Sequence, residues 1–287
     1  MKKNYFAILV YCCCAVSIYA QQQPARFGWI ENAEIRRESG VATVSCNHPD
    51  AMSDVISAVR LEYGWTVSVE APPFFSDFDL IDDTPPKWKA THPSGRVRRA
   101  RVGKFTSAYT EYPDMSQAPA QESVLKKIIA DYNASENAGK YELLRLGDGS
   151  YDVVPSSVTD SDDLEKRVQP ILDTIISIPE QERSVFETIE TIFDALTTKT
   201  GKKIILFTPS SNDLMKRATI GGESVSARSL VTRALAATSR PMLWELGYNP
   251  NKEIYLFSPS VVMMAQQTET GQSVPVAIDR IKARSRQ

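Results

Sequence analysis

The chain has 287 residues, and its 33 basic and 35 acidic side chains leave a formal net charge of −2. This near balance does not favour nucleic acid as the partner. The length is sufficient for two domains of modest size.

The first twenty residues are typical of a secretory signal peptide. Lys2 and Lys3 precede an apolar run from Tyr5 to Tyr19, and Ala20 stands before three glutamines. The run is short for a bilayer span, and no later segment is apolar enough to be one. We therefore expect residues 1–20 to be removed and the protein to be exported, periplasmic or secreted, with no membrane span after cleavage.

Cleavage would leave Cys46 as the only cysteine, because the other three are Cys12, Cys13 and Cys14. A single cysteine excludes an internal disulfide, so the thiol is either buried or paired between chains. Its place in the apolar stretch VATVSC favours a buried small hydrophobic residue.

Residues 24–155 predict a first α+β domain. VATVSC (41–46) and WTVSVE (65–70) read as strands on either side of an amphipathic helix, which Asp50 is placed to cap and Gly64 to end. A second amphipathic helix follows, and residues 147–149 form a hairpin turn between YELLRL and YDVVP. The apolar stripes of the two helices are Met52, Val55, Ile56 and Val59, and Val124, Leu125, Ile128, Ile129 and Tyr132.

An insertion at about residues 72–103 interrupts this first domain. It holds the side chains that are the best candidates for binding: Phe74, Phe75, Phe78, Trp88, Arg96, Arg98, Arg99 and Arg101. Exposed aromatic and basic residues would suit an acidic protein face or another anionic envelope polymer. Alternatively, the aromatic rings cover the core and the arginines protect an edge strand. Both interpretations stay open.

After an acidic linker at residues 156–170, residues 171–262 predict a second α+β domain. A strand at 171–178, closed by Pro179, precedes a helix with Ser184 as cap, Gly201 as terminator and an apolar stripe at Phe186, Ile189, Phe193 and Leu196. KKIILF (202–207) and a short strand at 218–220 follow. Ser226 then caps a second helix that ends at Arg240-Pro241, and MLWEL and EIYLF form a hairpin. Residues 263–287 read as a polar C-terminal tail.

Both halves therefore predict the order β-α-β-β-α-β-β, with two helices packed on a small mixed sheet. This plan resembles the short N-terminal domain of secretins and of signalling TonB-dependent receptors. The first helix of that domain ends at a glycine before a strand, and the second leads into a hairpin. Leu196, Gly201, Leu230 and Leu235 match its pattern. The resemblance covers most of residues 171–262 and, more loosely, 41–155. The chain is also similar to exported bacterial proteins of unassigned function that join two such units. The resemblance implies an envelope protein that binds other proteins or copies of itself.

Side chains suited to catalysis or to metal binding form no recognisable motif. His48 and His92 both precede prolines, which favours turns, and no metal or cofactor spacing occurs. The segment IGGESVS (220–226) could offer backbone amides to an anion or merely connect a strand to a helix.

We therefore expect a non-enzymatic binding or assembly module that needs no cofactor. One alternative is a hydrolase of envelope carbohydrate that uses Asp77, Asp79, Asp82 and Asp83. Another is a ligand-binding or inhibitor protein that uses the aromatic insertion.

Overall fold

The computed structural model describes residues 33–74, 76–101, 104–111, 119–147, 149–160, 162, 164–207, 212–268 and 273–278. The predicted signal peptide, residues 1–20, and Phe75 lie outside these ranges. The described part mixes five α-helices with several sheets, so the α+β class is confirmed. In that part of the chain, no helix is both long and apolar enough to span a membrane.

Among the described residues, the first half of the chain contains two long helices, one short helix and eight strands. Its elements are β1 (Ala33–Glu38), β2 (Val41–Cys46), α2 (Ala51–Tyr63), β3 (Val67–Glu70), β4 (Leu80–Asp82), α3 (Pro86–Thr91), β5 (Arg98–Ala100), β6 (Phe105–Thr110), α4 (Gln121–Asn133), β7 (Lys140–Arg145) and β8 (Tyr151–Thr159). Gly64 ends α2 in the left-handed conformation, with φ of 70°, as the sequence predicts.

The second half begins with a strand that pairs back onto β8. Its elements are β9 (Glu165–Arg167), a 3-10 turn (Ile171–Asp173), β10 (Ile175–Ser184), α5 (Val185–Thr200), β11 (Ile204–Leu206), a second 3-10 turn (Asn212–Met215), β12 (Arg217–Ser226), α6 (Ala227–Ala236), β13 (Met242–Asn249), β14 (Ile254–Val261), β15 (Met263–Gln267) and β16 (Ser273–Ala277).

Several boundaries differ from those predicted. Strand β10 starts later than expected and continues through Pro179 to Ser184, because its pairing with β12 shifts register between Ile178 and Gln181 and the proline falls at that irregularity. Helix α6 ends at Ala236, before Pro241. The expected linker, 156–170, contains the end of β8 and all of β9, and the expected polar tail contains the β15–β16 hairpin.

The segment 220–226 is part of strand β12, and it does not form a strand-to-helix turn. Gly221 lies directly against the backbone of β10, where a Cβ atom would come within 2.4 Å of Glu180 Cα. Close packing of β12 against β10 therefore explains why residue 221 is a glycine, and binding of an anion is not needed to explain it.

Strand pairing joins the two halves in one large sheet, ordered β11-β14-β13-β3-β8-β7, with β9 beside β8. Three strand pairs of the first half have a counterpart in the second half. The antiparallel pair β2–β6 corresponds to β10–β12, the parallel pair β3–β8 to β11–β14, and the antiparallel pair β7–β8 to β13–β14. The parallel pair β3–β13 connects the halves.

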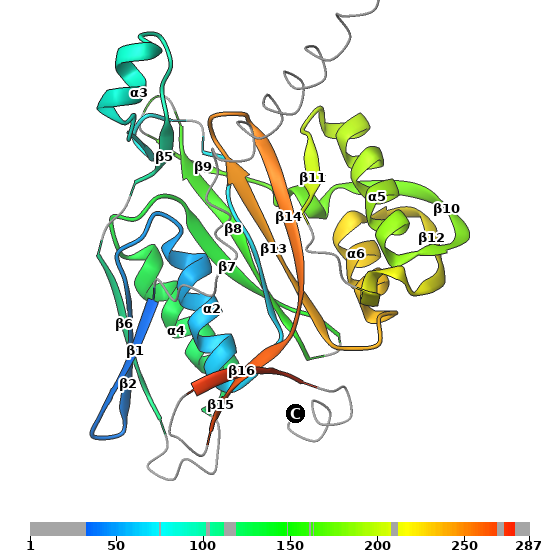
Figure 1. Cartoon of the computed structure of the whole chain (residues 1–287), viewed down its shortest axis with the longest axis horizontal. Helices are drawn as coiled ribbons and strands as arrows, with labels where there is room; N and C mark the ends of the chain where they lie inside the picture. Colours follow the sequence, from blue (N-terminus) through cyan, green and yellow to red (C-terminus); the bar gives the residue numbers. More distant parts are fainter. Residues whose placement is uncertain are drawn as a thin grey trace, which may run out of the picture. The chain divides into compact units, whose positions relative to one another are not determined.

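Helices lie between this large sheet and a smaller sheet in each half (Figure 1). Helices α2 and α4 contact strands of both β1-β2-β6 and the large sheet, and α5 and α6 likewise contact β10–β12 and the large sheet. Each half has its own cluster of buried apolar side chains, which includes the helix stripes predicted from the sequence. Burial of these stripes is the main source of stability for helices of this length.

Ser184 forms the predicted cap of α5. Its hydroxyl accepts a hydrogen bond from the Glu187 N–H at 3.1 Å, while the Glu187 carboxylate accepts the Ser184 N–H at 2.8 Å. We expect Ser184→Ala to lower the free energy of unfolding by about 1 kcal/mol, because one helix-end amide loses its partner. Urea denaturation measures this loss. Glu190→Ala, at an exposed position of the same helix, is the control. An equal loss in both variants would contradict the capping role.

Candidate functional site

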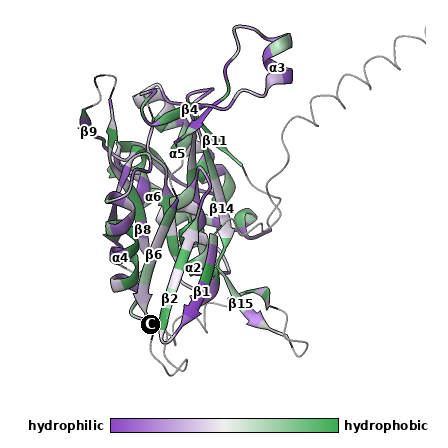
Figure 2. Ribbon diagram, turned by 90° about the vertical axis from the view of Figure 1, so that its left-hand side faces the viewer, coloured by the Kyte–Doolittle hydropathy of each residue, from purple (hydrophilic) through white to green (hydrophobic). Residues whose placement is uncertain are grey.

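The insertion folds as a β4–β5 hairpin that carries α3 at its tip (Figure 2). The buried carboxylate of Asp79 fixes its base, since it accepts the Thr159 N–H at 2.8 Å and the Thr159 hydroxyl at 3.1 Å. The backbone of Arg98 exchanges two hydrogen bonds with the side chain of Asn251. The insertion is therefore anchored to β8 and to the β13–β14 turn.

The predicted aromatic residues do not form one cluster. Phe74 is half-buried and lies near Gly139. Phe78 is 48% exposed, with the guanidinium of Arg101 4.5 Å from its ring centroid. Trp88 of α3 stacks on His92, the residue that follows the helix, with ring centroids 4.5 Å apart. Phe74 and Trp88 are thus both half-buried, and of these three rings only that of Phe78 is exposed.

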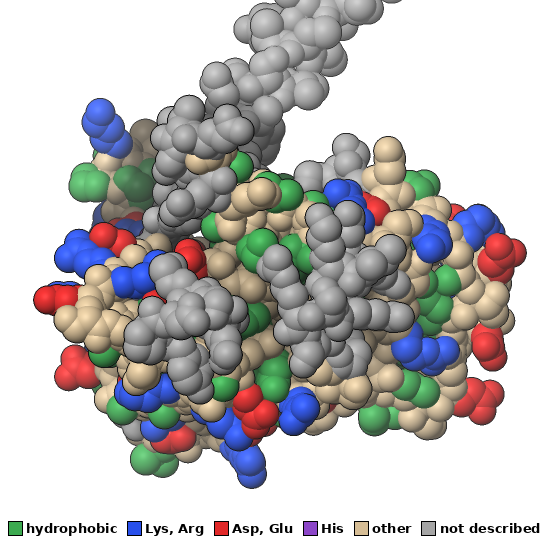
Figure 3. Space-filling model, turned by 90° about the horizontal axis from the view of Figure 1, so that it is seen from below, with side chains coloured by type: hydrophobic (Ala, Val, Ile, Leu, Met, Phe, Trp, Pro, Cys, Tyr) green, Lys and Arg blue, Asp and Glu red, His purple; other side chains and the backbone are tan. Residues whose placement is uncertain are grey.

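The arginines of the insertion have different partners. Arg98 pairs with Asp77 at 3.5 Å and Arg99 with Asp83 at 2.5 Å, whereas Arg96 is exposed. Exposed pairs of this kind contribute little to stability, and they leave the tip partly basic. On the face shown in Figure 3, acidic and basic side chains are interspersed. That face provides no uniformly charged surface for an anionic partner.

The acidic residues of the insertion point to separate partners. Asp77 and Asp83 pair with arginines, Asp79 binds Thr159, and Asp82 accepts the Thr84 N–H at 3.0 Å. A glycosidase needs two carboxylates facing each other across a sugar. These residues therefore give the hydrolase alternative no support.

Cys46 is buried and free, as its sequence context favours. Burial raises the pKa of its thiol, so the reactive thiolate is disfavoured. His48 Nδ1 lies 2.7 Å from an Asp54 carboxylate oxygen. This pair sits at the start of α2, where it ties the β2–α2 turn to the helix.

Within the residues that the structure describes, a buried ion cluster surrounds Arg228. Three of its N–H groups donate to three carboxylates: Nη2 to Glu70 at 2.6 Å, Nη1 to Asp152 at 2.8 Å, and Nε to Asp173 at 2.6 Å. Glu70 and Asp152 side chains are each 1% exposed and that of Arg228 is 7% exposed. The guanidinium carbon also lies 5.5 Å from the Trp244 ring centroid.

No protein-family model matches this chain, and no curated protein or solved structure matches it significantly. The resemblance to secretin N-terminal domains therefore rests on the sequence pattern. Within the described ranges, no group of three or more His, Cys, Asp or Glu side chains is arranged to hold a metal ion.

The ion cluster connects the halves of the chain. Glu70 (β3) and Asp152 (β8) belong to the first half, and Arg228 (α6) to the second. Glu70 also accepts the Ile171 N–H at 2.5 Å. Burial raises the pKa of Glu70 to about 7, against the opposing charge of Arg228. Three carboxylates share one guanidinium, so a proton on Glu70 reduces a buried excess of negative charge.

Sequence analysis did not identify this cluster, although one signal was present. Arg228 comes two residues after the Ser226 cap, in the first turn of α6. A positive charge is unfavourable there because the helix dipole is positive at that end. Such a residue suggests acidic partners from elsewhere in the fold. The sequence pattern does not identify those partners, because Glu70 is 158 residues away from Arg228 along the chain.

Proposed function

We propose that the protein is an exported, non-enzymatic binding or assembly module of the bacterial cell envelope, built from two related α+β domains. Three recurring kinds of strand pair support the two-domain relationship. The partner is another envelope protein or a further copy of the chain, and the insertion is the contact surface.

The observation that carries this proposal is the exposed ring of Phe78 under the Arg101 guanidinium. Aromatic and arginine side chains are enriched at protein–protein interfaces relative to the rest of the surface. Arg96 adds an exposed positive charge on the same hairpin. A ligand-binding or inhibitor protein could use this surface in the same way, and the identity of the captured partner would distinguish it from an assembly module.

Phe78→Ser is expected to abolish partner capture from envelope extract while leaving the melting temperature nearly unchanged. The reason is that Phe78 is already half in solvent, and exposed substitutions usually change stability by less than about 0.5 kcal/mol. Leu164→Ser, which alters a 64% exposed leucine outside the insertion, is the matched control and should capture the partner normally.

Two outcomes would count against an insertion interface. One is normal capture by Phe78→Ser, and the other is a large fall in its melting temperature, which would assign the ring to core packing. Light scattering on residues 21–287 separates the two kinds of partner: a concentration-dependent oligomer indicates self-assembly, and a monomer that captures a second protein indicates a heterologous partner.

A further inference from the structure

Strand β10 has one edge without a neighbouring strand in the described part of the chain. It pairs with β12 in a two-stranded sheet, whereas the corresponding sheet of the first half has three strands, β1-β2-β6. Strands β2 and β10 each run into the first long helix of their half, α2 and α5. The open edge of β10 therefore corresponds to the place that β1 occupies on β2.

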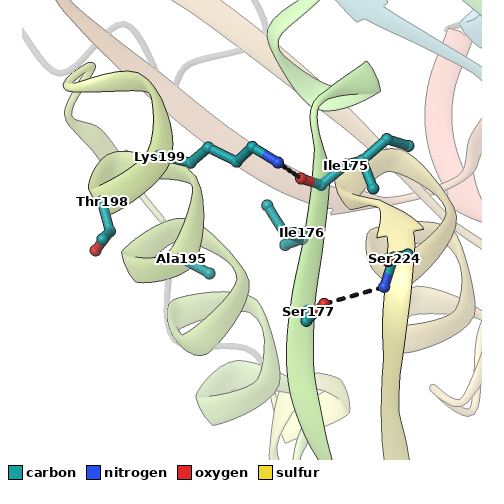
Figure 4. Close-up of a pocket in the computed structure, with 7 residues that line it drawn as sticks. All are labelled: Ile175, Ile176, Ser177, Ala195, Thr198, Lys199 and Ser224. Atoms are coloured by element: carbon teal, nitrogen blue, oxygen red, sulfur yellow. Dashed lines mark hydrogen bonds between the residues drawn. The ribbon is translucent and has the colours of Figure 1, made fainter.

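A hollow of about 310 Å³ lies between β10 and α5 and extends to Ser224 of β12. Its walls include Ile175 and Ile176 of β10 and Ala195 and Lys199 of α5. Figure 4 shows Lys199 reaching across from α5 to the carbonyl oxygen of Ile175, at 2.6 Å, on the side of β10 away from Ser224 of β12. Ile175 is 45% exposed. The hollow thus combines an apolar surface, an edge carbonyl and a cation.

The two helices can be aligned from the glycines that end them, Gly64 and Gly201. In this alignment the buried residues Val59 of α2 and Leu196 of α5 coincide. Glu62 of α2 then coincides with Lys199 of α5. The residue that faces the open edge of β10 is therefore the charge-reversed counterpart of Glu62.

In the first half, Glu62 contacts the strand that fills this place. Its carboxylate accepts a hydrogen bond from Arg37 of β1 at 2.7 Å. Ala33 of the same strand is buried, and Ile35 packs against the core. Strand β1 is thus an internal template: it lies antiparallel to β2, turns alternate apolar side chains inward and places a charge opposite the helix.

We propose that the groove between β10 and α5 binds an extended segment of a partner protein by antiparallel strand addition, with an acidic side chain of that segment on Lys199. The backbone of the segment would complete the open edge of β10, as peptides do in other cases of strand addition. Lys199 would exchange the Ile175 carbonyl for the carboxylate, so the lysine protects the edge until the segment binds.

Two fluorescent peptides test the charge rule directly. Both span residues 32–40 around β1, one with the native sequence and one with Arg37→Glu. The intact protein is expected to bind the Arg37→Glu peptide about tenfold more tightly than the native one, by fluorescence anisotropy. Lys199→Glu should reverse this preference. Lys252→Glu changes net charge equally at an exposed turn position and should leave the preference unchanged.

Hydrogen exchange identifies the mode of binding. Strand addition predicts slower exchange of backbone amides in β10 when the Arg37→Glu peptide is bound. The proposal is overturned if neither peptide binds up to about 1 mM, if Lys199→Glu does not change the preference, or if β10 gains no protection. Phe78→Ser should bind both peptides as the unaltered protein does, because the insertion is a separate site. A negative result in the peptide-binding experiment is therefore distinguishable from a negative result for the insertion interface.

Discussion

Arg228→Met is expected to lower the free energy of unfolding by about 3–5 kcal/mol. The substitution removes the guanidinium that donates hydrogen bonds to Glu70 and to Asp152, whose side chains are each 1% exposed. Two buried carboxylates would then lose the charge-assisted hydrogen bonds that offset the cost of their burial. Methionine has a similar length, so loss of packing volume contributes little to the expected effect.

Chemical denaturation measures this effect, with the Arg233→Met variant as the matched control. Arg233 lies on the same helix, α6, and donates to the carbonyl of Gly221 at 2.9 Å. Its replacement removes one charged donor from a solvent-reachable position, so we expect a much smaller loss. Comparable losses in the two variants would show that the cluster has no special role in joining the halves.

A double variant tests the origin of the loss. At a pH well above 7, where Glu70 would be ionised, adding Glu70→Gln to Arg228→Met removes one of the negative charges that the arginine no longer offsets, and part of the lost stability should return. If the two substitutions are simply additive, the destabilisation does not come from buried carboxylates that have lost the guanidinium.

Stability is expected to fall as the pH rises from about 4.5 to 7. The pKa of Glu70 is raised by burial from its ordinary value of 4.5 to about 7 in the folded protein. Between these values the folded state keeps a proton that the unfolded state has released, so increasing pH favours unfolding. The interval corresponds to a change of about 3 kcal/mol if Glu70 alone is considered.

Glu70→Gln isolates this contribution. The amide cannot ionise, so the difference in unfolding free energy between the protein and the variant should vary with pH over this interval. Glu182→Gln, at an exposed position of β10, should follow the pH profile of the unaltered protein. A profile that is identical for the protein and Glu70→Gln would show that Glu70 is ionised throughout, with Arg228 outweighing its burial.

The ion cluster also explains how two α+β halves with separate cores are held together. Beside it, the parallel β3–β13 pair adds backbone contacts such as the Ala71 N–H to the Leu246 carbonyl at 2.7 Å. Arg60 of α2 additionally pairs with Glu245 of β13. Unfolding is therefore expected to be cooperative across the described halves, which share one large sheet.

The sequence by itself determined the local elements. Apolar spacing located α2, α4, α5 and α6, and Ser184, Ser226 and the helix-ending glycines marked most of their ends. These features were predictable because they depend on residues within a few turns of one another. The same is true of the β7–β8 and β13–β14 hairpins, whose turns lie in one short stretch of chain.

Only the tertiary structure decided how the halves meet and which side chains face each other there. Periodicity shows that β3 and β13 are strands, but it does not select one as the partner of the other. Arg228, Glu70 and Asp152 come from three distant segments, and their buried charges are stable only as a group. The open edge of β10 was equally hidden, because an edge is defined by a neighbour that belongs to another part of the chain.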